Sequence, residues 1–306
     1  MSYYWPMETN APDDGLSDFI SVRPRLFGIA YRMLGSAVEA EDVVQDAWMR
    51  WQTTDRSVVE NPAAFLVTTT TRLAINVSES ARTRRETYVG PWLPEPIDTS
   101  EDPRLGAERG EALELAVLLL LEKLPPTERA AYTLREAFDY PYREIADILQ
   151  TTEANTRQLV TRARKHIADG RRASVSNTER SRFLNAFISA ARNGDLLGLE
   201  TLFASDVVSM SDGGGFVRAA RNPVVGRERV AKFISSVQWF WTGVKVDEVE
   251  ANGQPCVLIS RGGDAVVVVV VDASDDGINQ IWWLMRPSKL RAIAPALSKL
   301  GQQSSS

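Results

Sequence analysis

The chain has 306 residues, of which 44% are hydrophobic and 25% are charged, and its formal net charge at pH 7 is −5. This length favours two or three domains, and the acidic balance excludes nucleic-acid binding by a uniformly basic chain, so any such binding must be local. A single cysteine, Cys256, and a single histidine, His166, exclude a disulfide framework, a cysteine-rich zinc site and classical His-dependent hydrolysis, and we expect no metal and no cofactor.

The N-terminal residues carry no secretion signal. Residues 1–15 are polar, contain prolines and show no periodicity, so we expect a flexible tail. The apolar run Val266–Val271 is far too short to span a bilayer. The sequence therefore predicts a soluble, cytoplasmic protein with no membrane partner.

Two amphipathic helices follow the tail. Apolar residues recur at helical spacing from Leu16 to Leu34, and Gly35 and Ser36 supply the end of this helix and the cap of the next. The second helix, Val38–Gln52, has an apolar stripe and a largely acidic opposite side. That acidic side is either the solvated face of a helical bundle or a surface for a partner protein.

The segment AEDVVQDAWMRW within the second helix resembles region 2.2 of bacterial sigma factors. The resemblance implies that the polar face of this helix binds the β′ clamp helices of core RNA polymerase. The residues at the matching positions are Asp42, Gln45 and Asp46.

A third helix is predicted to begin after Asn61-Pro62 and to continue through ARTRR, which completes a helical domain over residues 16–86. Its place matches sigma regions 2.3 and 2.4, which capture unstacked bases of the −10 element. Such capture needs a basic track for phosphates and polar or aromatic side chains for bases. The candidate −10 residues are Arg72, Asn76, Arg82, Arg84 and Arg85.

An acidic, proline-rich linker is predicted over residues 87–110. Residues 86–111 hold seven acidic residues and two arginines. The linker is either simply solvated, or it keeps two basic modules apart from each other and from DNA until a partner binds. Proline favours an extended linker, and we expect Trp92 and Leu93 to dock on another part of the chain.

A helix-turn-helix is predicted within residues 111–172, after helical residues that resume at Ala107. Tyr142–Leu149 forms its first helix, and Thr152 caps a second helix with a buried apolar face. Six basic and two acidic residues lie between Thr151 and Arg172. The alternative is an ordinary helical hairpin with a solvated basic face. The outward residues of the second helix are Arg157, Gln158, Thr161, Arg162, Arg164 and Lys165.

The approach LPPTE followed by this helix-turn-helix resembles sigma region 4. Regions 2 and 4 in this order resemble an extracytoplasmic-function (ECF) RNA polymerase sigma factor. The resemblance implies promoter DNA and core polymerase, including the β flap, as partners. In such a helix, Arg157, Gln158 and Arg162 would read −35 base edges, while the later basic residues would reach phosphates.

Residues 177–306 change character to two helical segments followed by strands. The Asn252-Gly253 pair is typical of a hairpin turn, and the pattern as a whole predicts an α+β cone with a curved antiparallel sheet. The complete fold class is therefore all-α sigma regions 2 and 4 followed by an α+β domain. The predicted strands cover residues 206–212, 244–251, 255–260, 265–272 and 279–285.

This C-terminal part resembles the SnoaL-like, NTF2-like domain that a group of ECF sigma factors carries. The resemblance rests on WLPEPI in the linker, on DGGG followed by NPVVGRERVAKFI, and on RPSKL near the end. It implies that the domain packs on the sigma core and regulates polymerase binding in cis. A glycine-rich hairpin turn is the alternative for DGGG. The residues implied at or near the contact are Asp212, Gly213, Gly214, Gly215, Arg286, Pro287, Lys289 and Leu290.

Two other functions stay open. The chain could be a free-standing helix-turn-helix regulator that senses a small-molecule ligand through the cone. It could also be a SnoaL-like cyclase or isomerase tethered to a DNA-binding module, with Asp212 or Asp264 as a buried base. We expect no enzyme, because this domain has no histidine and shows no paired acid. The tryptophans available to line such a pocket are Trp239, Trp241, Trp282 and Trp283.

Overall fold

The structure is a computed structural model that describes residues 15–99, 114–291 and 293. Residues 1–14 of the predicted tail, most of the acidic part of the linker and the beginning of the helix predicted from Ala107 lie outside the described residues. Within those described ranges, no helix combines the length and apolar character that crossing a membrane requires.

Three long helices form the N-terminal bundle, as the sequence predicts. The first ends because Gly35 adopts a left-handed φ of 64°, and the Ser36 side chain accepts a hydrogen bond from the backbone N–H of Glu39 at the start of the second. Asn61 caps the third helix in the same way. The elements are α1 (Leu16–Leu34), α2 (Ala37–Thr53), a short 3₁₀ turn η1 (Arg56–Val58) and α3 (Pro62–Glu86).

The helix-turn-helix module follows the linker. Gln150 ends its first helix with a left-handed φ of 53°, and Thr152 caps the second by accepting from the N–H of Asn155 at 3.1 Å. The buried face of the second helix is the predicted one. The elements are α5 (Leu115–Glu122), α6 (Pro126–Tyr132), a π-helical turn η3 (Thr133–Ala137), α7 (Tyr142–Leu149) and α8 (Glu153–Gly170).

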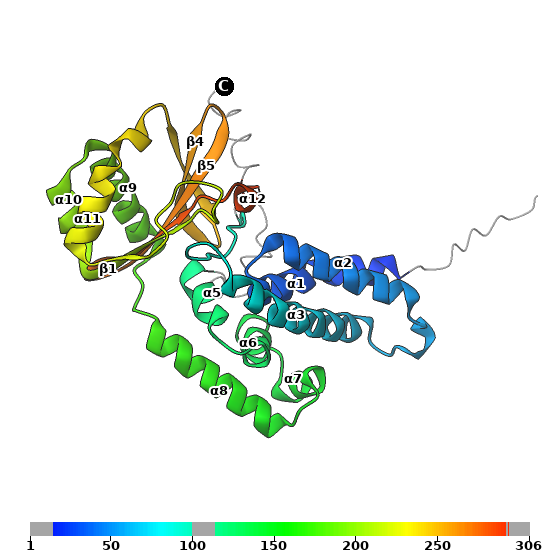
Figure 1. Cartoon of the computed structure of the whole chain (residues 1–306). Helices are drawn as coiled ribbons and strands as arrows, with labels where there is room; N and C mark the ends of the chain where they lie inside the picture. The colour runs from blue at the N-terminus through cyan, green and yellow to red at the C-terminus, as the bar shows by residue number, and fades with distance from the viewer. Residues whose placement is uncertain (1–14, 100–113, 292, 294–306) are drawn as a thin grey trace, which may run out of the picture.

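The two helical modules pack directly on each other and share one hydrophobic core (Figure 1). Apolar residues of α1 and α3 belong to the same buried cluster as those of α5 to α8. Leu34 of α1 and Leu134 of η3 are both members of this cluster. The prediction that the acidic linker keeps the modules apart is therefore wrong. The part of the linker that the structure describes is not simply solvated either, because residues 93–97 are buried. The apolar surface buried between the modules stabilises this packing.

The C-terminal domain is an α+β domain built on one six-stranded sheet with the strand order β2-β1-β6-β5-β4-β3. Its strands are β1 (Phe203–Asp212), β2 (Val224–Val225), β3 (Lys245–Ala251), β4 (Gln254–Arg261), β5 (Asp264–Ser274) and β6 (Gly277–Leu284). Its helices are α9 (Asn177–Asn193), α10 (Leu196–Leu202), α11 (Arg227–Ser236), a 3₁₀ turn η4 (Gln238–Trp241) and α12 (Pro287–Leu290).

The predicted fold class is confirmed, with one correction to the sheet. β1 pairs with β6 in parallel, whereas the other pairs are antiparallel, so the expectation of a purely antiparallel sheet is wrong. The connection from β1 crosses to the far edge through α11 before β3 begins, and a parallel pair requires such a crossover. The predicted Asn252-Gly253 hairpin joins β3 to β4.

Both faces of this sheet are covered (Figure 1). Side chains alternate between the faces along each strand: Trp283 joins the core under α9 to α11, and its neighbour Trp282 joins a second core on the opposite face. That second core also takes Leu93 of the linker and Leu115 of α5. Burial on both faces explains why the strand at Val266–Val271 is apolar without interruption.

Candidate nucleic-acid and partner-binding surfaces

The predicted polymerase-binding residues lie exposed on α2. Asp42, Gln45 and Asp46 share the exposed face, and two exposed hydrophobic residues, Val38 and Met49, lie at matching helical spacing before and after them. This face therefore combines carboxylates with apolar side chains, a composition suited to another protein.

The linker caps the N-terminus of α2. The carboxylate of Glu95 accepts hydrogen bonds from the backbone N–H of Ala37 at 2.7 Å and of Val38 at 3.4 Å, and the Ser36 hydroxyl donates to it at 3.1 Å. A carboxylate at a helix N-terminus satisfies free N–H groups and complements the helix dipole. The linker thus determines how α2 begins.

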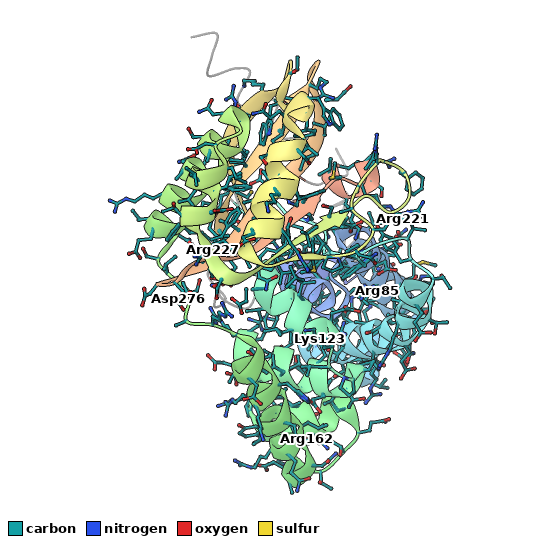
Figure 2. All side chains as sticks on the ribbon, turned by 60° about the vertical axis from the view of Figure 1, so that its left-hand side comes forward. Arg85, Lys123, Arg162, Arg221, Arg227 and Asp276 are labelled. Atoms are coloured by element: carbon teal, nitrogen blue, oxygen red, sulfur yellow. The ribbon has the colours of Figure 1, made fainter. Side chains whose placement is uncertain are left out.

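The six predicted −35 residues are all exposed on α8, at the end of the molecule away from the sheet, where Figure 2 shows Arg162. Some are held by neighbours: Arg157 pairs with Glu153 at 2.5 Å, and Arg164 pairs with Glu136 at 2.7 Å. Gln158 and Lys165 have no partner among the described residues. The helix presents a polar, basic face on which the positions predicted to read bases are exposed.

The five predicted −10 residues do not form one free track. Asn76 and Arg82 are exposed on α3. The Arg72 Nε donates to the carbonyl oxygen of Ile148 at 3.0 Å, at the C-terminal end of α7. Arg84 pairs with Glu39 on α2. Three of the five, Arg72, Arg84 and Arg85, are thus engaged by other parts of the chain.

Arginines connect the two helical modules. Arg85 forms an ion pair with Glu122, donates to the Leu34 carbonyl oxygen at 2.5 Å and stacks on the Trp92 ring at 3.5 Å. Arg129 of α6 donates to the Met33 carbonyl oxygen at 2.5 Å, and burial lowers the pKa of Arg129 although Glu122 opposes the effect. We call these contacts, with that of Arg72, the helix junction.

Residues 88–99, here called the linker strap, cross the C-terminal domain. The Leu93 N–H donates to Asp212 Oδ2 at 2.9 Å, and the Leu93 carbonyl oxygen accepts from Lys289 Nζ. Lys289 also pairs with Asp212 at 2.7 Å, and their side chains are 3% and 0% exposed. Burial lowers the pKa of Lys289 to about 8, while Asp212 opposes the shift. We call this ion pair and its strap contacts the strap junction.

Tyr88 completes the strap junction. Its hydroxyl donates to Asp212 Oδ1 at 2.5 Å, and burial together with this carboxylate raises the pKa of Tyr88. Gly214 and Gly215 have left-handed φ values of 55° and 78°, and a Cβ on Gly214 would lie 2.6 Å from the Tyr88 hydroxyl oxygen. The glycines therefore serve a turn and a close interdomain approach together.

The remaining residues implied by the resemblance lie at the same junction. Arg286 is positioned over the Tyr88 ring at 5.4 Å, Pro287 opens α12, and Leu290 is buried in the core with Leu93. The structure thus brings the strap, the glycine turn and the C-terminal motif together.

A second strap contact could not be predicted from the sequence. Asn252 accepts from the Ile97 N–H at 3.1 Å and donates to the Tyr31 hydroxyl at 2.6 Å, which donates to the Glu95 carbonyl oxygen at 2.5 Å. The sequence identifies Asn252 only as a turn residue. Its partner Tyr31 is 221 residues away, so no local pattern connects them.

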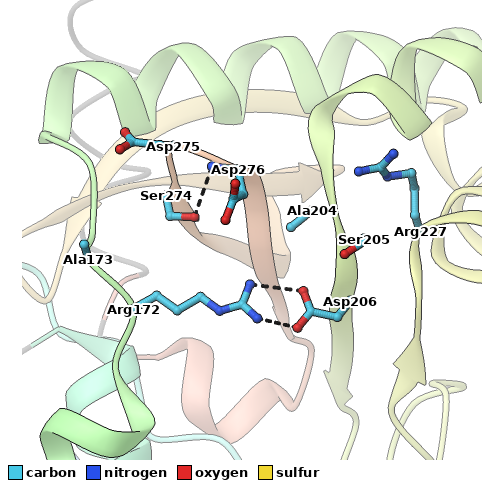
Figure 3. Close-up of a pocket in the computed structure, with 9 residues that line it drawn as sticks. All are labelled: Arg172, Ala173, Ala204, Ser205, Asp206, Arg227, Ser274, Asp275 and Asp276. Carbon is cyan, nitrogen blue, oxygen red and sulfur yellow. Dashed lines mark hydrogen bonds and ion pairs between the residues drawn. The ribbon is translucent and has the colours of Figure 1, made fainter.

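A polar depression of about 690 Å³ lies where α8 meets the sheet, between Arg172 and Arg227 (Figure 3). Arg172 spans it with an ion pair to Asp206 on β1 and donates to Asn279 Oδ1 at 2.6 Å. This pair links the helix-turn-helix module to the C-terminal domain, and the sequence offered no signal for it.

The carboxyls considered as catalytic bases do not face the apolar cavity of the C-terminal domain. Asp264 is exposed at the β4–β5 turn, and Asp212 belongs to the strap junction. Trp239, Trp241 and Trp283 line that cavity. The expectation that Trp282 also lines it is wrong, because strand alternation turns its side chain to the opposite face.

Comparison with known proteins agrees with this arrangement. Residues 19–85 match Sigma-70 region 2, and residues 114–167 match Sigma-70, region 4. The ECF RNA polymerase sigma factor SigJ of Mycobacterium tuberculosis is 36% identical over 225 residues, which cover 72% of each protein. This chain belongs to the ECF RNA polymerase sigma factors.

Two further similarities cover more of this ECF sigma factor. The probable ECF RNA polymerase sigma factor SigI of M. tuberculosis is 32% identical over 274 residues, covering 88% of this chain and 92% of SigI. The crystal structure of M. tuberculosis SigJ matches with a TM-score of 0.72 and 29% identity, covering 90% of this chain and 98% of SigJ. The predicted sigma-factor function is confirmed, and sigma factors bind core RNA polymerase and promoter DNA. The N-terminal bundle and the helix-turn-helix module are accordingly regions 2 and 4.

Proposed function

We propose that the structure is the closed form of this sigma factor and that its C-terminal domain restrains opening in cis. The observation that carries this proposal is the state of the candidate DNA residues. Those for the −35 element are exposed and form ion pairs only within the helix-turn-helix module, whereas Arg72 and Arg85 of α3 are held by Ile148 and Glu122 of that module. Arg72 and Arg85 must release these groups before they bind DNA.

The dimensions of a promoter support an opening step. The −10 and −35 elements are separated by about 25 base pairs, or about 85 Å at roughly 3.4 Å per base pair. The 18-residue α8 is only about 27 Å long, and α7, its partner in the helix-turn-helix, is in hydrogen-bond contact with α3. Regions 2 and 4 must therefore separate before one molecule reads both elements.

Core polymerase would bind the closed form first through α2. Asp42, Gln45 and Asp46 are the residues that we assign to the β′ clamp helices, and they are exposed in this form. Region 4 would then bind the β flap. When the helix junction opens, Arg72 would leave the Ile148 carbonyl oxygen, and Arg85 would leave Glu122 and the Leu34 carbonyl oxygen. Both guanidinium groups would then bind DNA phosphates, which are strong acceptors.

The C-terminal domain is placed to oppose this opening. Through the strap junction it holds the linker, and the linker caps α2 through Glu95. It also holds region 4 directly, because Arg172 pairs with Asp206 on β1. Separation of region 4 has to break this pair.

Run-off transcription tests the restraint. Full-length chain and core polymerase would be assayed on a template selected by this holoenzyme from random promoters. Asp206→Asn removes an exposed ion pair without touching the core, so we expect initiation to rise about two- to fivefold, as the loss of such a pair allows. Asp264→Asn is the matched control, since Asp264 is an exposed aspartate of the same domain, and it should leave initiation unchanged.

The outcomes distinguish a failure of the cis restraint from a failure of the assigned polymerase-binding face. Equal initiation by Asp206→Asn and wild type would contradict the cis restraint at this contact. If α2 binds the clamp helices, Asp42→Asn combined with Asp46→Asn should abolish initiation and polymerase capture together. Normal capture by that double variant would contradict the assignment of the polymerase face.

Salt dependence tests the −35 surface. Lys165 would contact a phosphate, so Lys165→Ala should weaken binding to every −35 sequence alike and reduce the slope of log K against log salt by about one. Gln158→Ala should change the preference for one base and leave the slope unchanged. Lys232→Ala, on α11, is the control. A uniform effect of Gln158→Ala would argue against base reading.

A further inference from the structure

The C-terminal domain contains an apolar cavity of about 90 Å³ on the face of the sheet covered by α11. The end of β1, the segment after the glycine turn and η4 enclose it. Its walls are aromatic, and two neighbouring rings, Phe240 and Trp241, contact each other edge to face at a centroid distance of 5.4 Å. No part of the transcription mechanism above uses this cavity.

Polar groups without partners lie in its wall and at its mouth. Trp241 is 8% exposed and its buried indole Nε1 has no acceptor within the described ranges, whereas Trp283 Nε1 donates to the Ser209 hydroxyl at 3.0 Å. A buried donor without an acceptor is unfavourable. Arg218, also a lining residue, is exposed and makes no ion pair or hydrogen bond with the described residues.

We propose that this cavity binds a small carboxylate that carries a short alkyl chain. The aromatic walls take the apolar part, the Trp241 indole donates to an acceptor, and the Arg218 guanidinium binds the carboxylate at the mouth. A cavity of roughly 150 Å³ holds benzene. The smaller volume here therefore excludes rings and long chains.

The cavity and the strap junction lie on opposite faces of the same strand end. Ser211 lines the cavity, and the next residue, Asp212, turns to the other face and pairs with Lys289. Met285, another lining residue, donates its N–H to the Asp212 carbonyl oxygen at 2.9 Å. A ligand that displaces Ser211 or Met285 therefore also moves Asp212.

The segment after β1 also connects the cavity to the linker strap. Arg218 and Ala219 line the cavity, whereas Gly214 and Gly215, a few residues earlier, lie against Tyr88 and Val89 of the strap. Binding of the carboxylate would loosen the strap and raise initiation. This second step rests on the proposed cis restraint, whereas binding itself does not.

Binding is tested on the full-length chain without polymerase. Propanoate and butanoate would be titrated by calorimetry, with tryptophan fluorescence as a second readout, and each would be compared with its neutral amide, propanamide or butanamide. We expect each carboxylate to bind about tenfold more tightly than its amide, because a charged hydrogen bond is added. If neither carboxylate binds more tightly than its amide, the proposal is overturned.

Three variants locate the site. Arg218→Gln should remove the preference for the carboxylate and keep weak amide binding, whereas Ala220→Leu, which fills the cavity, should remove both. Arg229→Gln is the matched control, because Arg229 is an exposed arginine on α11 outside the cavity. Unchanged butanoate binding by Arg218→Gln would place the site elsewhere and overturn the proposal.

Run-off transcription with butanoate tests the coupling. Initiation by wild type should rise with butanoate, and initiation by Arg218→Gln should not. If butanoate binds without changing initiation while Asp206→Asn still raises it, the coupling is wrong and the cis restraint stands. If neither changes initiation, the cis restraint itself has failed, and the binding data still decide whether the carboxylate site exists.

Discussion

The helix junction and the strap junction hold the same chain by different chemistry. At the helix junction, Arg72 and Arg129 donate to backbone carbonyl oxygens, and Arg85 pairs with Glu122. At the strap junction, Asp212 and Lys289 form an ion pair with almost no solvent exposure. Asp212 accepts a hydrogen bond from the Leu93 N–H, and Lys289 donates one to the Leu93 carbonyl oxygen. Two of the arginines at the helix junction are candidate DNA residues, whereas the strap junction contains no candidate DNA or polymerase residue.

This difference indicates which junction opens. An arginine that leaves a carbonyl oxygen for a DNA phosphate exchanges one acceptor for a stronger one, so the helix junction can be replaced by promoter contacts. Breaking a buried ion pair leaves charges without compensation and costs about 3–5 kcal/mol when one partner is removed. We therefore expect region 4 to move away first, and the strap to leave the C-terminal domain only when another interaction weakens the buried ion pair.

The largest effect should come from Lys289→Met. This change leaves Asp212 buried without its cation and removes the hydrogen bond to the Leu93 carbonyl oxygen. The strap junction should lose about 3–5 kcal/mol. Hydrogen exchange of the peptide that covers residues 88–97, measured by mass spectrometry, should accelerate accordingly.

Its control is Lys245→Met. Lys245 pairs with Asp247 at 2.8 Å, but its side chain is 56% exposed, so its removal should cost less than about 1 kcal/mol. The double variant Lys289→Met with Asp212→Asn should recover part of the loss, because no charge is then left buried. Equal exchange in Lys289→Met and wild type would show that the ion pair does not hold the strap.

Arg72→Gln should have a smaller effect, on the other junction. Arg72 contributes hydrogen bonds to the Ile148 carbonyl oxygen and, at 3.4 Å, to that of Asp147. Their loss should weaken region 2–region 4 contact by about 1–3 kcal/mol, since hydrogen bonds to charged groups have this strength. Small-angle scattering should report a larger radius of gyration, while exchange in the strap stays unchanged.

Arg82→Gln is the matched control, because Arg82 is an exposed arginine of the same helix. Both variants should weaken binding to single-stranded −10 DNA, and only Arg72→Gln should expand the free protein. Expansion in both would mean that general charge, rather than the contact with α7, holds the two regions together.

The sequence predicts the helices well because their signals are local. Caps such as Ser36 and Thr152 and the apolar face of α8 lie within a few residues of the structure they determine. The parallel pairing of β1 with β6 depends on a connection that runs through α11 and four strands. A strand pattern alone cannot distinguish it from an antiparallel pairing.

The candidate site residues likewise fall into two groups, those whose exposure follows from local periodicity and those whose contacts depend on tertiary packing. Exposure on α2 and α8 follows from helical periodicity, so the predicted surfaces there are accessible. The occupation of Arg72 and Arg85 does not follow, because Ile148, Glu122 and Trp92 are brought to them by tertiary packing. Glu95 and Asn252 were missed for the same reason, since each bonds to groups more than fifty residues away.

The smallest expected effect is the response of the strap junction to pH. Burial lowers the pKa of Lys289 from its ordinary value of 10.5 to about 8. Asp212 and Glu95 act against this shift and Arg286 adds to it, and the neighbouring Tyr88 hydroxyl keeps its proton because its own pKa is raised. When the strap is released, Lys289 is hydrated and holds its proton more tightly than in the docked state.

The sign follows from this linkage. The docked state carries the penalty of a buried ammonium fully below about pH 8, and the penalty disappears as the pH approaches 10.5. The neutral amine still donates to Asp212 and to the Leu93 carbonyl oxygen, hydrogen bonds that Lys289→Met removes. Raising the pH from about 7 to about 9 should therefore stabilise docking by about 1 kcal/mol. Hydrogen exchange of residues 88–97, corrected for the intrinsic pH dependence of exchange, should show greater protection at the higher pH. Lys289→Met should abolish this dependence, and a wild-type strap that loosened on alkalinisation would show that the attraction to Asp212 outweighs the desolvation of Lys289.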